Sequence, residues 1–356
     1  MDSYDVERDI VECDEEVDSE NGSYDISYKL TSYGMDLPAD VLFYRYQGKQ
    51  MYLPDFQRNY VWNKKQASKF IESLLLGLPI PGIFLYKEKN EKMLILDGYQ
   101  RIESLARYRN NLFENNNFKL SGVNEIFNNR NYQELSDREQ NKINNSIIHA
   151  TIIQADDPED KNYHAVYEVF ERLNTGGIKL SPQEVRNCVA DGDFRKRISE
   201  LANNKDVKNF LSISNKRKKD EEVVLRLIAL CLRPYSGNMK QFLNSFMFDN
   251  KDLIDKNVKQ VLENFISIVQ FMDKIQANKY FKVNDKLSLA ILDSIWVSVY
   301  KNYDNLKNIS VKIIKQKLDE LMKDSKYENA IKTGTTHNKT SVDDRLKKAV
   351  EFLQNV

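Results

Sequence analysis

Cysteine and histidine are scarce in this chain of 356 residues. The three cysteines and three histidines lie far apart, without the close spacing of a zinc site or a disulfide framework. Their scarcity argues against a metal centre held by histidine and cysteine, and it fits a reducing cytoplasm. No apolar run approaches the roughly 20 residues that a membrane span needs, and the acidic start does not resemble a secretory signal. We therefore expect a cytoplasmic protein without a membrane partner.

The zero net charge conceals an uneven distribution. The chain has 53 basic and 53 acidic residues, and a hydrophobic content of 41% is enough for a sizeable core. Residues 1–20 hold ten of the acids and one base, which leaves 52 basic and 43 acidic residues for the rest. A like-charged segment with few apolar residues cannot offset its ordering entropy. We predict an acidic, disordered tail over residues 1–25, which is either a solvated leader or a competitor with nucleic acid for a basic surface.

Residues 93–105 are the stretch around which the chain is organised. An unbroken apolar run over 93–96, typical of a strand buried on both faces, is interrupted by Asp97-Gly98 and followed by apolar residues at helical spacing. The start of a helix presents unpaired N–H groups and a partial positive charge, and phosphate binds readily there. Gln100 and Arg101 lie at this point. The alternative interpretation is an ordinary structural turn.

Two Gln-Arg pairs each follow an aspartate by two or three residues. They are Gln57-Arg58 after Asp55, and Gln100-Arg101 after Asp97. A guanidinium group matches phosphate oxygens with two parallel hydrogen bonds. Two such pairs in one small domain predict binding of a polyphosphate or a nucleic-acid backbone. The alternative is that each arginine pairs internally with its own aspartate.

The patterns around these pairs predict an α/β domain over residues 26–157. Asn63 is a natural N-cap for a helix over 64–78 with one apolar face. Short strands over 83–86 and 93–96 form a hairpin. A capping box that begins at Ser136 opens another helix, and a strand over 149–155 completes the sheet.

We predict an all-helical domain over residues 158–356. Its first helix ends at a loop made of Asn174, Thr175, Gly176 and Gly177. Two glycines after a helix form a C-terminal cap, or their backbone N–H groups bind phosphate. Ser181-Pro182-Gln183-Glu184 then gives a complete helix start signal. Arg186, close in sequence to the loop, is a candidate phosphate ligand.

The densest basic run in the chain precedes a strongly predicted helix. It consists of Lys216, Arg217, Lys218 and Lys219. Such a run is either a solvated turn or a contact with the DNA backbone, and the second role would make binding fall steeply with salt. Thr336-His337-Asn338-Lys339 has the letter order of a nuclease motif, but no second histidine or asparagine cluster supports it.

Several blocks together resemble a known family. Residues 54–62, 70–81 and 97–101, followed by 170–177 and 180–187, look like the ParB-related domain at the front of GmrSD-type restriction enzymes, a module also found in the SspE defence protein. The resemblance spans residues 35–240 but includes no C-terminal HNH nuclease domain. It implies an α+β chain, in which a ParB/sulfiredoxin-like α/β domain precedes an all-α domain. It also implies nucleoside triphosphate binding, with hydrolysis coupled to DNA sensing or cleavage.

The resemblance also implies roles for individual residues. Asp97 would position Mg²⁺ or Mn²⁺ or a water, and Gln100 and Arg101 would hold the phosphates as the other catalytic residues. The expected phosphate-binding set is completed by Gln57, Arg58, Gly98, Tyr99 and the loop residues Asn174, Thr175, Gly176 and Gly177. One position departs from the family pattern: Tyr99 stands where the family has glutamine, and a phenol lacks the paired donor and acceptor of an amide.

Three functions remain open at this point. The first is an NTP-hydrolysing protein of restriction or anti-phage defence that acts with DNA, including modified or phage DNA. The second is a metal-dependent nuclease in its own right, with Asp55, Glu72 or Asp97 serving the metal. The third is a non-enzymatic sensor of nucleotide or DNA that recruits a separate nuclease or effector subunit. Association with a second copy of the chain is compatible with each.

Overall fold

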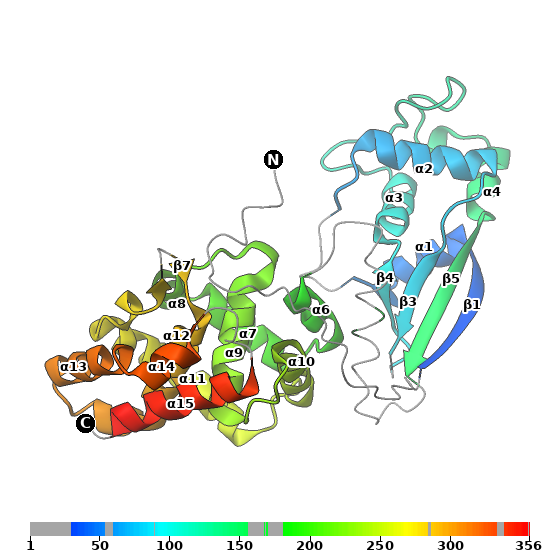
Figure 1. Cartoon of the computed structure of the whole chain (residues 1–356). Helices are drawn as coiled ribbons and strands as arrows, with labels where there is room; N and C mark the ends of the chain where they lie inside the picture. The colour runs from blue at the N-terminus through cyan, green and yellow to red at the C-terminus, as the bar shows by residue number, and fades with distance from the viewer. Residues whose placement is uncertain are drawn as a thin grey trace. The chain divides into compact units, whose positions relative to one another are not determined.

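The computed structural model describes residues 30–53, 60–88, 90–155, 167, 169, 181–283, 286–332, 338–354 and 356. These residues belong to two compact units, within residues 26–179 and 180–356. Figure 1 shows the elements of both units, and each unit is described by itself. The predicted acidic tail and the predicted boundary at residue 158 lie outside the described residues and stay predictions.

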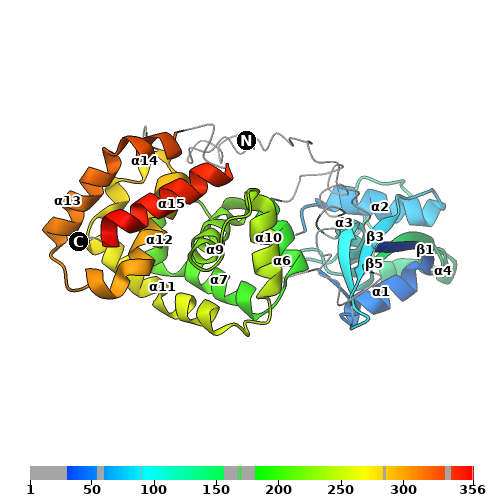
Figure 2. The same ribbon diagram turned by 60° about the horizontal axis from the view of Figure 1, so that its bottom comes forward.

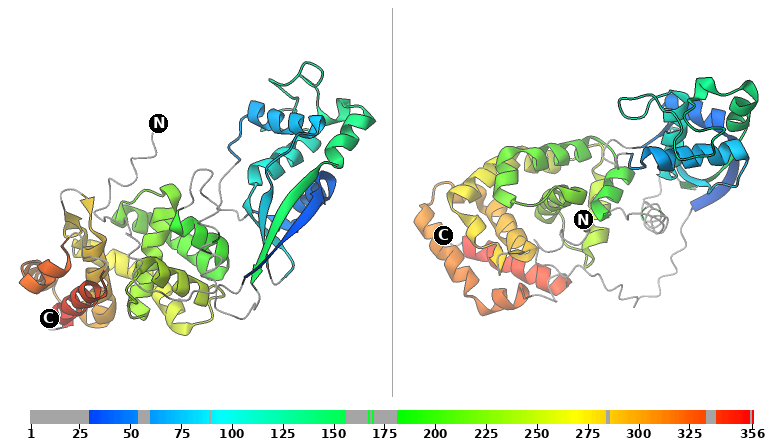
Figure 3. Two further views of the ribbon diagram at one scale, coloured as in Figure 1. Left: turned by 45° about the vertical axis from the view of Figure 1, so that its right-hand side comes forward. Right: turned by 90° about the horizontal axis from the view of Figure 1, so that it is seen from above.

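A mixed five-stranded sheet organises the first unit, which we call the α/β unit. The strand order is β1-β5-β3-β4-β2, with antiparallel pairing of β1 with β5 and of β3 with β4. The pairs β3–β5 and β2–β4 are parallel. Figure 3 shows the long strands β1 and β5 side by side. The elements are β1 (Leu30–Pro38), α1 (Ala39–Gln47), β2 (Met51–Tyr52), α2 (Lys64–Leu76), β3 (Ile83–Lys87), β4 (Met93–Asp97), α3 (Tyr99–Arg109), a 3-10 turn (Tyr132–Glu134), α4 (Asp137–Asn144) and β5 (Ile147–Ala155).

Alternate residues of the strands share one core with α1–α4. Ile83 and Leu85 of β3 and Ile95 of β4 pack in this core with Leu42 of α1 and Ile102 of α3. Residues 93–96 of β4 are all buried, as the unbroken apolar run predicts. The predicted hairpin of β3 and β4 is confirmed by their antiparallel pairing.

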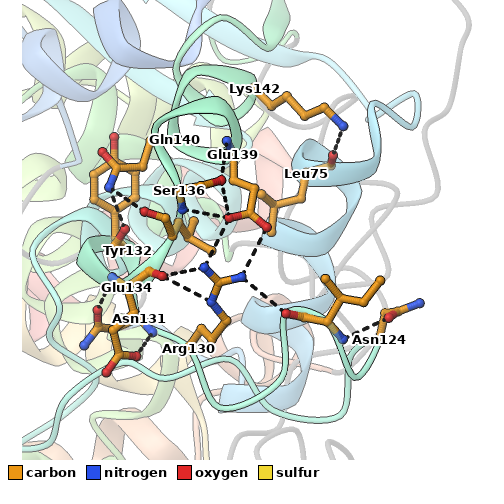
Figure 4. A network of polar contacts seen from close by, with 12 residues as sticks. Leu75, Asn124, Arg130, Asn131, Tyr132, Glu134, Ser136, Glu139, Gln140 and Lys142 are labelled. Carbon is orange, nitrogen blue, oxygen red and sulfur yellow. Dashed lines mark hydrogen bonds and ion pairs between the residues drawn. The ribbon is translucent and has the colours of Figure 1, made fainter.

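The helix starts of the α/β unit follow their capping signals. The Asn63 side chain accepts the N–H of Gln66, whose own side chain accepts the N–H of Asn63, so α2 begins where predicted. Ser136 and Glu139 form the predicted capping box of α4. Between α3 and α4, Arg130 fixes a long loop: it forms an ion pair with Glu139 at 3.2 Å and donates to the carbonyl of Glu134 (Figure 4).

The second unit, which we call the helical unit, begins at residue 181 in the described chain. Figure 2 shows α9 among its neighbours α7, α10 and α12. Most residues of α9 and α12 are buried, so they form the centre of the core. The elements are α6 (Pro182–Val189), α7 (Asp193–Asn203), α8 (Lys205–Leu211), a 3-10 turn (Lys216–Lys218), α9 (Lys219–Leu232), α10 (Met239–Asp249), α11 (Lys256–Lys274), a 3-10 turn (Ala277–Lys279), β6 (Lys282–Val283), β7 (Lys286–Leu287), α12 (Leu289–Leu306), α13 (Val311–Met322), α14 (Ser325–Ala330) and α15 (Lys339–Gln354).

These elements confirm the predicted α+β class, a mixed α/β domain followed by a mostly helical one. One detail was wrong: the second unit is not all-helical, because Lys282–Val283 pairs with Lys286–Leu287 as a short antiparallel hairpin. Two-residue strands are too short to show a period in the sequence. None of the helices in the described ranges is long and apolar enough to cross a membrane.

A buried charge cluster joins three helices of the helical unit. Asp293 of α12 accepts hydrogen bonds from Arg226 of α9 at 2.7 Å and from Arg345 of α15 at 3.4 Å. Asp293 and Arg345 are fully buried and Arg226 is nearly so. Removing this carboxylate would take the charge of Asp293 away from two buried guanidinium groups, which is far more costly than losing a surface pair.

We predict that Asp293→Asn lowers the free energy of unfolding of the helical unit by about 3–5 kcal/mol. Trp296, buried in α12, reports on this unit by its fluorescence during urea denaturation, in a Trp62→Phe background. Glu320→Gln is the control, since the Glu320–Lys317 pair is partly exposed and its loss should change stability by less than about 1 kcal/mol. Equal stability of the two variants would contradict the role of the cluster.

Candidate active site at the β4–α3 turn

The turn between β4 and α3 requires a glycine. Gly98 has a φ of +96°, which side chains rarely allow. A Cβ built at this position would lie 2.3 Å from Cγ2 of Ile83 on β3. The tight turn brings Asp97, the last residue of β4, next to the first turn of α3, and no side chain caps the start of that helix.

Arg101 links the turn to the neighbouring strand. One terminal nitrogen, Nη2, donates to Oδ2 of Asp97 at 2.8 Å and to the carbonyl of Gly82, just before β3, at 2.9 Å. The internal Asp97–Arg101 pair, which the sequence left as an alternative, is therefore present. The Asp97 side chain is 50% exposed and that of Arg101 only 16%. The Nε atom of Arg101 is buried without a hydrogen-bond partner among the described residues.

Gln100 holds the segment that precedes α2. Its Oε1 accepts the backbone N–H groups of Val61 at 3.0 Å and Trp62 at 3.1 Å. Nearby on α3, Ser104 shares a 2.7 Å hydrogen bond with the hydroxyl of Tyr60. This positioning role of Gln100 is not visible in the sequence, because the partners lie 38 and 39 positions away.

The chain is tied to β4 before positions 54–59 and to α3 after them. Before them, Met51 and Tyr52 of β2 run parallel to β4 toward its Asp97 end. After them, Val61 and Trp62 are bound by Gln100. Gln57 and Arg58, the predicted second phosphate-binding pair, lie outside the described residues. Their roles stay predictions.

Tyr99 belongs to a different polar group on α3. It packs against the core of the α/β unit. Burial and the nearby Glu103 carboxylate raise the pKa of Tyr99, so its phenol stays protonated. Glu103 accepts a hydrogen bond from the hydroxyl of Tyr46 at 2.7 Å and pairs with Arg107 at 2.7 Å. The residue that departs from the family pattern thus lies against a structural network.

Arg186 is not available to a ligand in this structure. It lies on α6 of the helical unit with only 2% exposure. Its guanidinium donates to Asn244 at 2.8 Å, to Gln183 at 3.0 Å and to Glu222 at 2.8 Å. Burial raises the pKa of Glu222, but Lys219 and Arg186 outweigh it and lower the pKa to about 2. The predicted phosphate ligand is instead the centre of a buried polar network.

The other predicted ligands of this region remain untested. Asn174, Thr175, Gly176 and Gly177 lie outside the described residues. In the basic run, Lys216 and Arg217 are exposed. Lys218 and Lys219 instead form ion pairs with Glu221 and Glu222 at 2.9 and 2.7 Å. The four cations of the run therefore differ in exposure, and their contact with DNA stays a prediction.

The carboxylates of the described residues fit one kind of metal site. The described residues include no group of three or more histidine, cysteine, aspartate or glutamate side chains that could hold a metal ion. Glu72 accepts the N–H of Asn124 at 2.6 Å and pairs with Lys69 at 2.7 Å. Asp97 is the exposed carboxylate at the turn. Magnesium is commonly held by one or two carboxylates together with phosphate oxygens and waters, and Asp97 fits that arrangement.

Fold and turn together define a mixed α/β domain with a polar strand–turn–helix site, joined in the same chain to a helical domain. Residues 41–191 match the family model described as GmrSD restriction endonuclease, N-terminal domain. Over these residues the chain is therefore similar to a GmrSD-type N-terminal domain, which agrees with the resemblance of its sequence blocks. The match covers the β4–α3 turn and extends to the end of α6. No curated protein matches the chain.

We predict that Gly98→Ala destabilises the α/β unit by about 2 kcal/mol or more, because it combines an unfavourable backbone conformation with a clash against Ile83. Urea denaturation followed by the fluorescence of Trp62 measures this. Gly77→Ala is the matched control: Gly77 also has a positive φ, of +70°, but a Cβ there meets nothing within 4 Å. Equal losses of stability in the two variants would contradict the steric argument.

Proposed function

We propose that this chain is a DNA-associated protein of the restriction or phage-defence type that binds a nucleoside triphosphate at the β4–α3 turn. The observation that carries the proposal is the position of Arg101. Its guanidinium lies at the start of α3, beside the exposed Asp97, with its buried Nε unpaired among the described residues. The match of residues 41–191 to a restriction-endonuclease domain supports the connection with DNA.

The ion pair at the turn gives each residue a role in binding. In its present state Arg101 neutralises Asp97, and a carboxylate paired with a guanidinium is a weaker metal ligand. A triphosphate that attracts the guanidinium would leave the Asp97 carboxylate to Mg²⁺. The uncapped N–H groups at the start of α3 favour negative charge at the same point. Phosphate and metal are thus expected to bind together more tightly than either alone.

Hydrolysis is the finer part of the proposal. Bound Mg²⁺ would neutralise charge on the phosphates, and Asp97 would hold the ion. Gln100, whose Oε1 already accepts two backbone N–H groups, would keep the segment before α2 in place and leave its amide N–H₂ group for a phosphate. This makes Gln100 a positioning residue in the proposal. Binding without turnover would favour the alternative of a nucleotide sensor that recruits a separate effector.

We predict that Arg101→Ala weakens binding of a non-hydrolysable ATP or GTP analogue with Mg²⁺ roughly 10- to 100-fold, the loss of a charge-assisted contact. Isothermal titration of the full chain measures the affinity. Arg138→Ala, which removes an exposed arginine of α4 in the same unit, is the control and should retain the parental affinity. If the parental chain binds none of the four common triphosphates, with or without DNA, the proposal fails.

A further inference from the structure

A groove with a volume of about 450 Å³ lies along α2 of the α/β unit. It is lined by Trp62, Lys65, Gln66, Lys69 and Gly122. These five residues contribute one large aromatic ring, two ammonium groups and one amide, and no carboxylate. Such a lining attracts a ligand that has both a flat ring and negative charge.

The walls of the groove are fixed by buried polar side chains. On α2, Ser68 accepts the N–H of Ser121 at 3.0 Å, and Glu72 accepts the N–H of Asn124 at 2.6 Å. Both side chains are buried. They therefore hold the loop on either side of Gly122 against the helix. The groove exists before any ligand arrives, so binding does not require the loop to be ordered.

The loop passes close to the side chain of Lys65 at Gly122. Gly122 has a φ of +69°, and a Cβ there would meet the side-chain carbons of Lys65 at 3.5 Å and beyond. The stem of Lys65 thus lies along the loop. Lys65 is exposed, and its ammonium group forms no ion pair with the described residues. Lys69, one helical turn further along, is 59% exposed although it pairs with Glu72.

Trp62 supplies the aromatic ring in the lining of the groove. Its indole is half-buried and contacts Phe70 of α2 with ring centroids 6.0 Å apart. The backbone N–H of Trp62 donates to Gln100. The ring contact and this hydrogen bond together hold Trp62 in place. An aromatic ring beside lysines is the usual means of binding single-stranded nucleic acid, since every base has a face that can stack.

We propose that this α2 groove binds a segment of single-stranded DNA, with a base stacked on Trp62 and phosphates near Lys65 and Lys69. A duplex hides its base faces within the stack, so it offers only phosphates to the groove. Every base has a face that can stack on an aromatic ring, so we expect this stacking to be sequence-tolerant. The proposal deepens the DNA-associated part of the proposed function and does not depend on nucleotide hydrolysis.

The two tryptophans of the chain make the test direct. They are Trp62 and Trp296, and Trp296 is fully buried in the helical unit. Titration of the full chain with a single-stranded 12-mer of thymidine should quench the fluorescence of Trp62 and reach saturation. Saturating quenching by the duplex of the same length at the same concentration would overturn the proposal.

Variants separate stacking from charge. By fluorescence anisotropy with a labelled 12-mer, Trp62→Leu should weaken binding roughly tenfold. The double variant Lys65→Ala/Lys69→Ala should reduce the slope of log K against log salt concentration by about 1.4, from about 0.7 per lost phosphate contact. Lys92→Ala, another exposed lysine of the same unit, is the control with unchanged binding. Parental affinity in Trp62→Leu and an unchanged salt slope in the double variant would each contradict the proposal.

The test of DNA binding in the α2 groove can be distinguished from the test of triphosphate binding at the β4–α3 turn. A chain that binds the 12-mer through Trp62 but binds no triphosphate contradicts the proposed function and leaves this inference standing. The opposite result is also possible. If the chain binds triphosphate through Arg101 but the Trp62→Leu variant binds the 12-mer with parental affinity, this inference is contradicted and the proposed function stands. Measuring both ligands on the parental chain, Arg101→Ala and Trp62→Leu distinguishes these results.

Discussion

The candidate site depends on the absence of a side chain at position 98. Because Gly98 allows a positive φ and leaves room for Ile83, β4 can pass directly into α3. This places Asp97 and Arg101 within 2.8 Å of each other. The same guanidinium then reaches the carbonyl of Gly82, which ties the turn to the start of β3. One steric constraint thus sets the distance between the carboxylate and the cation that the proposed chemistry uses.

Helix α3 also connects this turn to the α2 groove. Gln100 binds the backbone of Trp62, and Trp62 forms part of the groove lining. Residues of one helix therefore position both a candidate phosphate site and a candidate DNA-binding surface. A ligand that moved Gln100 would also shift the backbone of Trp62. This hydrogen bond is a physical route by which DNA binding and nucleotide binding could influence each other.

Local signals in the sequence predicted much of the fold and half of the site. The start of α2, the β3–β4 hairpin and the turn at Gly98 follow from neighbours in the chain. Strand β1 was not predicted, because it lies at the sheet edge and most of its residues are exposed, which leaves no apolar alternation. The burial of Arg186 was not predicted, because its partner Asn244 lies 58 positions away. The groove escaped notice for the same reason, since Gly122 reaches α2 only through the fold.

The most direct test of the account is a crystal structure of the full chain with a non-hydrolysable nucleoside triphosphate and Mg²⁺. We expect the phosphates at the start of α3, within hydrogen-bonding distance of the Arg101 guanidinium, with Asp97 directed at the metal instead of at Arg101. A triphosphate bound elsewhere, with the 2.8 Å Asp97–Arg101 pair unchanged, would contradict the assignment of this turn as the nucleotide site.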